Sequence, residues 1–249
     1  MRASLVVTKI VGRLTRAVFP GACVLCGTAT SPQHFCARCA LDLPRILNAC
    51  GHCAVPLAPS LTVCTDCRQR PPPFIAARAA LSYTFPIDAA LKALKFRRHL
   101  HYVPAFAQLL EPLLSETFPS ADALVPVPLH RWRHATRGFN QAQELCKPLG
   151  RKFGLPIMGH ARRIRRTRPQ AGLDAAARRR NLRNAFAIHG RLRCRHPLIV
   201  DDVMTTGETC RQLAAVLLDA GAETVGVLTV ARAAAPVRTG CYAATGRNV

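Results

Sequence analysis

The apolar residues after about residue 80 follow two patterns, helical stripes and short runs. Helical spacing starts at Ile87 and continues through Leu91, Leu94 and Phe96, and it returns over residues 106–114, 141–153 and in the stretch after Gly207. Short apolar runs typical of strands occupy residues 82–85, 123–128, 155–157, 185–188, 198–201 and 224–230. Strands that alternate with helices predict an α/β fold built on a parallel, doubly wound sheet.

The first 75 residues lack this alternation. Residues 1–20 place Leu5, Ile10 and Leu14 at roughly helical spacing with cations between them, which predicts a short amphipathic helix packed on the rest. The alternative is a segment lying on a membrane surface. Prolines make residues 71–75 a stiff linker. We therefore expect a helix at 1–20, a small module at 21–70, this linker, and an α/β domain at 76–249.

The small module holds eight of the twelve cysteines, in four Cys-x-x-Cys pairs. The pairs are Cys23/Cys26, Cys36/Cys39, Cys50/Cys53 and Cys64/Cys67. Two such turns supply four thiolates, the donor set of a structural zinc site. Consecutive pairing gives two sites; an interleaved arrangement, or one filled site, is the alternative. A thioredoxin-like redox motif occurs once and precedes a helix, so four clustered pairs favour one or two structural zinc ions instead. Because these thiols would bind metal rather than form disulfides, we expect a reducing compartment.

The chain is strongly basic, with 35 Lys and Arg against 13 Asp and Glu and a formal net charge of +22. Between residues 131 and 195 there are 18 cations and two acids. Such a surface favours contact with polyanions or phosphorylated ligands. An Arg-rich composition set by the genome is the alternative. No apolar run reaches about 18 residues, so no transmembrane helix is expected, and cations interrupt the N-terminal stretch too often for a secretory signal.

The most specific chemistry follows the apolar run at 198–200. Two carboxylates end the run and a loop rich in hydroxyl groups precedes a helical pattern; these residues are Asp201, Asp202, Thr205, Thr206, Gly207 and Thr209. The free N–H groups at a helix N-terminus attract an anion, and a glycine lets the chain approach it closely. Carboxylates one sugar away can accept hydrogen bonds from ribose hydroxyls. The stretch therefore predicts a site for a phosphoribosyl group, whereas an ordinary strand–turn–helix would not need paired acids.

A cationic loop at 131–141 follows the short strand at 123–128. Ligands of parallel sheets lie beyond the carboxyl ends of the strands, so both loops should meet at one edge. We expect Arg137 and the Gly138 backbone to face a pyrophosphate across from the carboxylates. A solvated basic turn is the alternative. The Arg-rich segment at 166–180 is the candidate lid.

The stretch at 197–209 resembles the loop with which type I phosphoribosyltransferases bind 5-phosphoribosyl 1-diphosphate (PRPP). The order Val-Pro-Val-Pro at 125–128, Arg-Gly-Phe-Asn-Gln at 137–141, and the motifs at 166–170, 179–186 and 200–209 resemble the ComF family, labelled competence protein F or GntX-like. The cysteine-rich region and residues 92–96 are similar too. The resemblance implies a double zinc ribbon followed by a type I phosphoribosyltransferase domain.

By that resemblance, Arg137 and Gly138 would line the pyrophosphate loop, and Mg²⁺ would bind on PRPP oxygens. The ribose and 5′-phosphate would be held by Asp201, Asp202, Thr205, Thr206, Gly207 and Thr209. It implies a cytoplasmic protein, or one at the inner face of the membrane, that acts in DNA uptake with PRPP, single-stranded DNA and DNA-uptake or recombination proteins as partners. Two hypotheses follow: Mg²⁺-dependent phosphoribosyl transfer to an unidentified acceptor, or single-stranded DNA binding with a regulatory or vestigial PRPP site. Aromatic residues for base stacking are sparse, and Phe139 and Phe186 fit core positions better.

Overall fold

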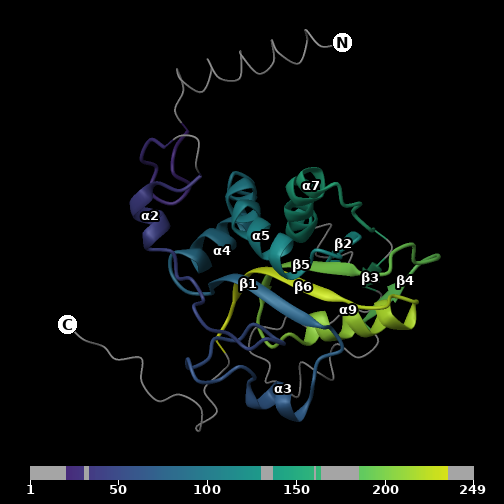
Figure 1. The fold of residues 1–249 in the computed structure, drawn as a ribbon. Helices are drawn as coiled ribbons and strands as arrows, with labels where there is room; N and C mark the ends of the chain where they lie inside the picture. The colour runs from purple at the N-terminus through teal and green to yellow at the C-terminus, as the bar shows by residue number, and fades with distance from the viewer. Residues whose placement is uncertain (1–20, 31–33, 130–136, 160, 164–184, 235–249) are drawn as a thin grey trace.

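The computed structural model describes residues 21–30, 34–129, 137–159, 161–163 and 185–234 (Figure 1). The expected N-terminal helix at 1–20, the candidate lid at 166–180 and most of the cationic loop lie outside the described residues.

Four parallel strands form the central sheet. In sequence they are β1 (Ala76–Ser82), β2 (Ala123–Pro126), β5 (Pro197–Met204) and β6 (Gly226–Arg232), and their spatial order is β1-β6-β5-β2. Every residue of β6 is buried, as expected for a central strand covered on both faces. The predicted parallel α/β sheet is thus confirmed.

Helices cover both faces of this sheet (Figure 1). On one face lie α4 (Ile87–Arg97), α5 (Tyr102–Thr117) and α7 (Gln141–Phe153), and on the other lies α9 (Glu208–Asp219). Leu198 and Val200 of β5 pack in the core under α5 and α7, whereas Ile199 packs in the core with α9. The apolar run at 198–200 therefore serves both cores, because successive side chains of a strand point to opposite faces.

The two four-cysteine ribbons lie on opposite faces. The first, with α2 (Ala37–Leu41), adds Phe35 and Leu43 to the core under α4 and α5. The second, with α3 (Thr65–Gln69), shares a core with α9. Main-chain N–H groups of β1 donate to carbonyls of both, Ala77 to His52 (2.8 Å) and Ser82 to Pro44 (2.7 Å). The edge of the sheet formed by β1 is therefore covered by the cysteine-rich module.

Some predicted elements are wrong. The strand expected at 82–85 lies at Ala76–Ser82 instead, where small alanines gave a weak apolar signal but pair in register with β6. Residues 155–157 form one isolated bridge, Leu124 to Ile157. Ala161–Arg163, where no strand was predicted, forms strand β3, which pairs antiparallel with β4 (Phe186–Ile188). None of the described helices is long and apolar enough to cross a membrane.

Candidate functional site

The eight predicted metal ligands form two clusters, Cys23/Cys26/Cys36/Cys39 and Cys50/Cys53/Cys64/Cys67. Within each cluster all sulfurs lie within 4.8 Å of one another, and the Sγ atoms of Cys26 and Cys36, like those of Cys53 and Cys64, are 3.7 Å apart. A zinc–sulfur bond of about 2.3 Å in a tetrahedron requires sulfurs about 3.8 Å apart. The donor sets therefore fit zinc, and pairing is consecutive rather than interleaved.

Each metal site includes the N-cap residue of a short helix. Cys36 and Cys64 are the N-caps of α2 and α3, so their sulfurs accept the backbone N–H of Cys39 (3.5 Å) and Cys67 (3.4 Å). Such bonds stabilise thiolates, the form that binds metal. A hydrogen bond from Cys67 lowers the pKa of Cys53 to about 4, and the charge of Arg232 adds to this effect. Cys146, Cys194 and Cys210 are buried apart from both clusters.

The predicted phosphate loop joins β5 to α9. The strand continues beyond the two aspartates to Met204, and Gly207 is the N-cap of α9 with a left-handed φ of 76°. A residue with a Cβ would be strained in that conformation. Gly207 supplies no side-chain cap, while the Thr206 hydroxyl accepts the Glu208 N–H at 3.4 Å. The loop therefore presents the N-terminal end of a 12-residue helix beside the two carboxylates.

The second predicted loop is anchored by its own motif. Asn140 caps α7 by accepting the Ala142 N–H (3.0 Å) and donates to the Val127 carbonyl (3.0 Å), while Phe139 is buried in the core. Gly138 takes a left-handed φ of 72°. These contacts fix residues 137–141 next to the end of β2, where Arg137 and Gln141 line the same pocket as the phosphate loop. Phe186 is buried as well, as expected.

One pocket thus collects most of the predicted ligand-binding residues. Its lining includes Asp201, Asp202, Thr205, Gly207, Thr209 and Arg137. Thr206 and Gly138 are adjacent but do not line it. Among the polar and charged residues that line the pocket, sequence reasoning missed Tyr83, Lys95, Gln141 and Arg163. The carbonyl oxygen of the Gln141 side chain is buried and accepts no hydrogen bond from any residue that the structure describes, so it is available to a ligand donor.

The pKa values of the two aspartates are shifted in opposite directions. Although burial opposes it, the Lys95 ammonium, 2.8 Å from Asp202 Oδ2, lowers the pKa of Asp202. Burial and the charge of Asp202 raise the pKa of Asp201 well above its usual value. The charged form of Asp202 is therefore favoured by its pair with Lys95, whereas burial and the neighbouring Asp202 charge disfavour the charged form of Asp201. Lys95 lies on α4, so this ion pair joins the helix to the end of β5.

Comparisons with known proteins identify several similar chains. Residues 14–68 match a family model described as the double zinc ribbon domain. The DNA utilization protein YhgH of Salmonella typhi is 37% identical over 221 residues, which cover 86% of this chain and 97% of that protein. Competence protein F of Haemophilus influenzae is 31% identical over 222 residues, covering 86% and 91%. Among solved structures, a purine phosphoribosyltransferase from Pyrococcus horikoshii Ot3 aligns with 59% of this chain and 93% of its own, with a TM-score of 0.30 and 14% identity. With these motifs and relatives, the chain belongs to the ComF family of competence protein F and YhgH.

Proposed function

We propose that this protein binds PRPP, with Mg²⁺, in the pocket between β5, α9 and the 137–141 loop, and that it acts on incoming DNA during DNA uptake. One observation supports the PRPP assignment most directly: acidic residues, the N-terminal end of a helix and cationic side chains line the same pocket. A carboxyl pair at the end of a strand suits a ribose diol, the start of α9 suits a phosphate, and Arg137 and Lys95 suit a pyrophosphate.

The metal would be held mainly by the ligand. Mg²⁺ prefers oxygen donors and phosphates and retains several waters, so it would bind the pyrophosphate and ribose oxygens with few protein contacts. When bound, Mg²⁺ neutralises developing charge on a departing pyrophosphate.

Calorimetry with PRPP and with its two fragments tests the assignment. PRPP in the presence of Mg²⁺ is expected to bind at least about tenfold more tightly than ribose 5-phosphate or pyrophosphate alone, because the intact ligand engages both walls of the pocket. Failure of PRPP to bind, or equal affinity for PRPP and pyrophosphate, would contradict the proposal. Pyrophosphate release in a screen of nucleobases and single-stranded DNA as acceptors would show that the site also catalyses transfer.

A second function, binding of single-stranded DNA, is favoured by Phe96. The sequence placed this residue on the buried stripe of α4, but its side chain is 69% exposed. The Arg137 guanidinium lies 5.0 Å from the centre of its ring, and Lys92 and Arg97 line the same hollow on α4. An exposed aromatic ring among cations is the arrangement that stacks a base and contacts its phosphates. The relatives named for competence and DNA utilization support this role.

Replacing Phe96 with alanine is expected to weaken binding of single-stranded DNA about tenfold, since stacking is worth about 1–3 kcal/mol per base. Phe85, which lies just before the start of α4, is 81% exposed but lines neither of these hollows, so Phe85→Ala is the matched control and should bind like the wild type. Fluorescence anisotropy over a range of salt concentrations measures both variants. Wild-type affinity that did not fall steeply with salt would contradict an electrostatic contact with the phosphate backbone.

A further inference from the structure

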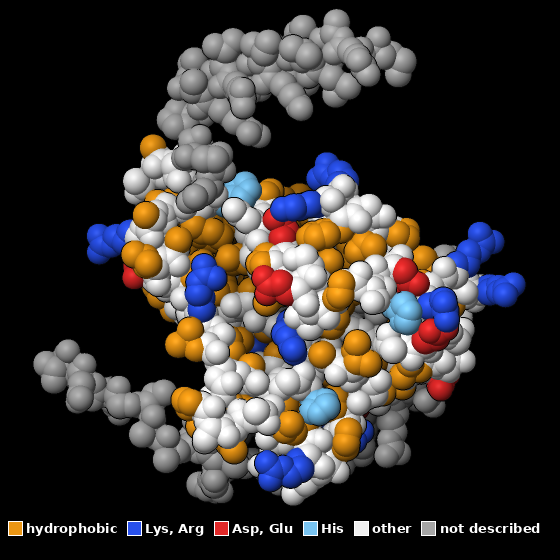
Figure 2. Space-filling view, viewed as in Figure 1, with side chains coloured by type: hydrophobic (Ala, Val, Ile, Leu, Met, Phe, Trp, Pro, Cys, Tyr) orange, Lys and Arg blue, Asp and Glu red, His pale blue; other side chains and the backbone are white. Residues whose placement is uncertain are grey.

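Lys and Arg side chains lie scattered over the face that Figure 2 shows, but two arginines of the α/β domain instead contact the second four-cysteine site, which packs against the phosphate loop. Its ligands Cys50, Cys53 and Cys67 share a buried core with Met204 and Cys210, which flank that loop. The first four-cysteine site belongs to the opposite side of the sheet, where its ribbon packs beneath α4 and α5. The two metal sites therefore differ in what they support, although their ligands and spacing are the same.

A buried arginine at the end of β6 joins the second site to the loop. Arg232 is 4% exposed and donates from Nε to the carbonyl of Cys53 (2.9 Å). Its Nη1 donates to the carbonyls of Met204 (3.0 Å), Thr205 and Ala233 (2.8 Å). One planar guanidinium thus holds the main chain of a metal ligand and the first residues of the phosphate loop at a fixed separation.

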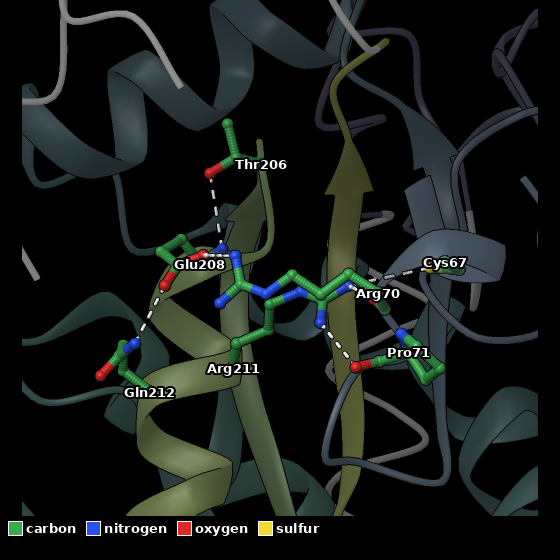
Figure 3. A network of polar contacts seen from close by, with 7 residues as sticks. All are labelled: Cys67, Arg70, Pro71, Thr206, Glu208, Arg211 and Gln212. Carbon is green, nitrogen blue, oxygen red and sulfur yellow. Dashed lines mark hydrogen bonds and ion pairs between the residues drawn. The ribbon is translucent and has the colours of Figure 1, made fainter. Parts of the chain in front are cut away.

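A second arginine makes the reverse contact from the first turns of α9 (Figure 3). Arg211 donates to the carbonyls of Pro71 and Arg70, each at 3.0 Å, and to the sulfur of Cys67 at 3.9 Å. In return, Arg70 lies 3.9 Å from the buried Glu208 carboxylate, which also accepts from Gln212 at 2.9 Å. The second ribbon and the start of α9 are therefore joined by polar contacts made from both sides.

The charges explain why arginines occupy these positions. A zinc ion held by four thiolates carries a net charge of −2, which favours cations placed around it. Arg211 and Arg232 come from the α/β domain and both contact residues that ligate the second metal. Loss of that metal would remove the charge they complement and release the turn of Cys64 and Cys67, against which Arg211 is held.

We propose that Arg211 and Arg232 are positioning residues through which the metal-bound second four-cysteine site holds the loop at 204–209 in its anion-binding conformation. The identity of the anion as PRPP rests on the proposed function, whereas the bracing of the loop does not. Coupling between two sites is reciprocal, so a ligand in the pocket must also retain the second metal. The first metal site takes no part.

Zinc release from the full chain to a coloured chelator measures this coupling. Cys26→Ser and Cys67→Ser each leave one site intact and so assign the two release phases. PRPP with Mg²⁺ is expected to slow release from the second site about tenfold, within the usual range of allosteric coupling, and to leave the first site unchanged. Arg211→Gln should abolish most of this effect, Arg211→Lys should restore part of it, and Arg38→Gln on α2 beside the first site is the matched control.

Backbone hydrogen exchange tests the brace without any ligand. The amides of 205–210 should exchange faster in Cys67→Ser than in the wild type, and Cys26→Ser should leave them unchanged. Equal exchange in all three proteins, or equal slowing of both zinc phases by PRPP, would overturn the proposal. Faster exchange in Cys67→Ser without any effect of PRPP on zinc release would support the brace and overturn the assignment of PRPP as the ligand.

Discussion

Replacing Lys95 with methionine is expected to lower the free energy of unfolding by about 3 kcal/mol at neutral pH, the usual cost of removing one partner from a buried ion pair. The Asp202 side chain is 5% exposed and its Oδ2 lies 2.8 Å from Lys95 Nζ, so the variant leaves its charge without that partner. Urea unfolding followed by circular dichroism measures the loss.

Two controls separate the pair from the helix that carries it. Lys92→Met lies one turn away on α4, where the lysine makes an exposed pair with Asp88 at 2.7 Å, and it should unfold like the wild type. The double variant Lys95→Met with Asp202→Asn removes both charges and should regain most of the lost stability. A loss in Lys92→Met as large as that in Lys95→Met would show that the helix, rather than the ion pair, is responsible.

Features encoded in consecutive residues could be predicted from the sequence. The metal ligands follow from Cys-x-x-Cys turns, in which local geometry alone sets the spacing of the sulfurs. The loop at 201–209 likewise owes its form to a strand end, a left-handed glycine and a helix start that are neighbours in the chain. The bounds of α7 could be predicted because Asn140 caps its start and Gly154 ends it.

Features that depend on tertiary packing could not be predicted. Lys95 reaches Asp202 only because α4 packs over the end of β5, and no local pattern distinguishes it from the exposed Lys92. Phe96 follows the apolar period of α4 but falls where the helix leaves the core. The docking of the second ribbon behind the phosphate loop depends on Arg232 and Arg211, which look like ordinary members of a very basic chain.

The opposite pKa shifts of the two aspartates lead to the prediction with the largest effect on binding. Asp202→Asn is expected to weaken PRPP binding about tenfold to a hundredfold, because a hydrogen bond to a charged acceptor is worth about 1.5–3 kcal/mol. Binding of ribose 5-phosphate should weaken in parallel, because this fragment keeps the diol. Binding of pyrophosphate should not weaken, because Lys95 is released from its ion pair with Asp202 and stays available to a phosphate.

Asp201→Asn is the matched control for this substitution. Burial and the charge of Asp202 raise the pKa of Asp201, so this carboxyl holds its proton to a higher pH than an ordinary carboxyl does, and a neutral amide is a closer mimic of Asp201 than of Asp202. The favourable effect of that proton is lost only as the pH rises through the raised pKa; below it, wild type and Asp201→Asn should bind PRPP similarly. Calorimetry of the two variants with PRPP, ribose 5-phosphate and pyrophosphate decides the matter. Equal losses in both variants, or a loss of pyrophosphate binding in Asp202→Asn, would contradict the role of Asp202 as the charged acceptor for the ribose.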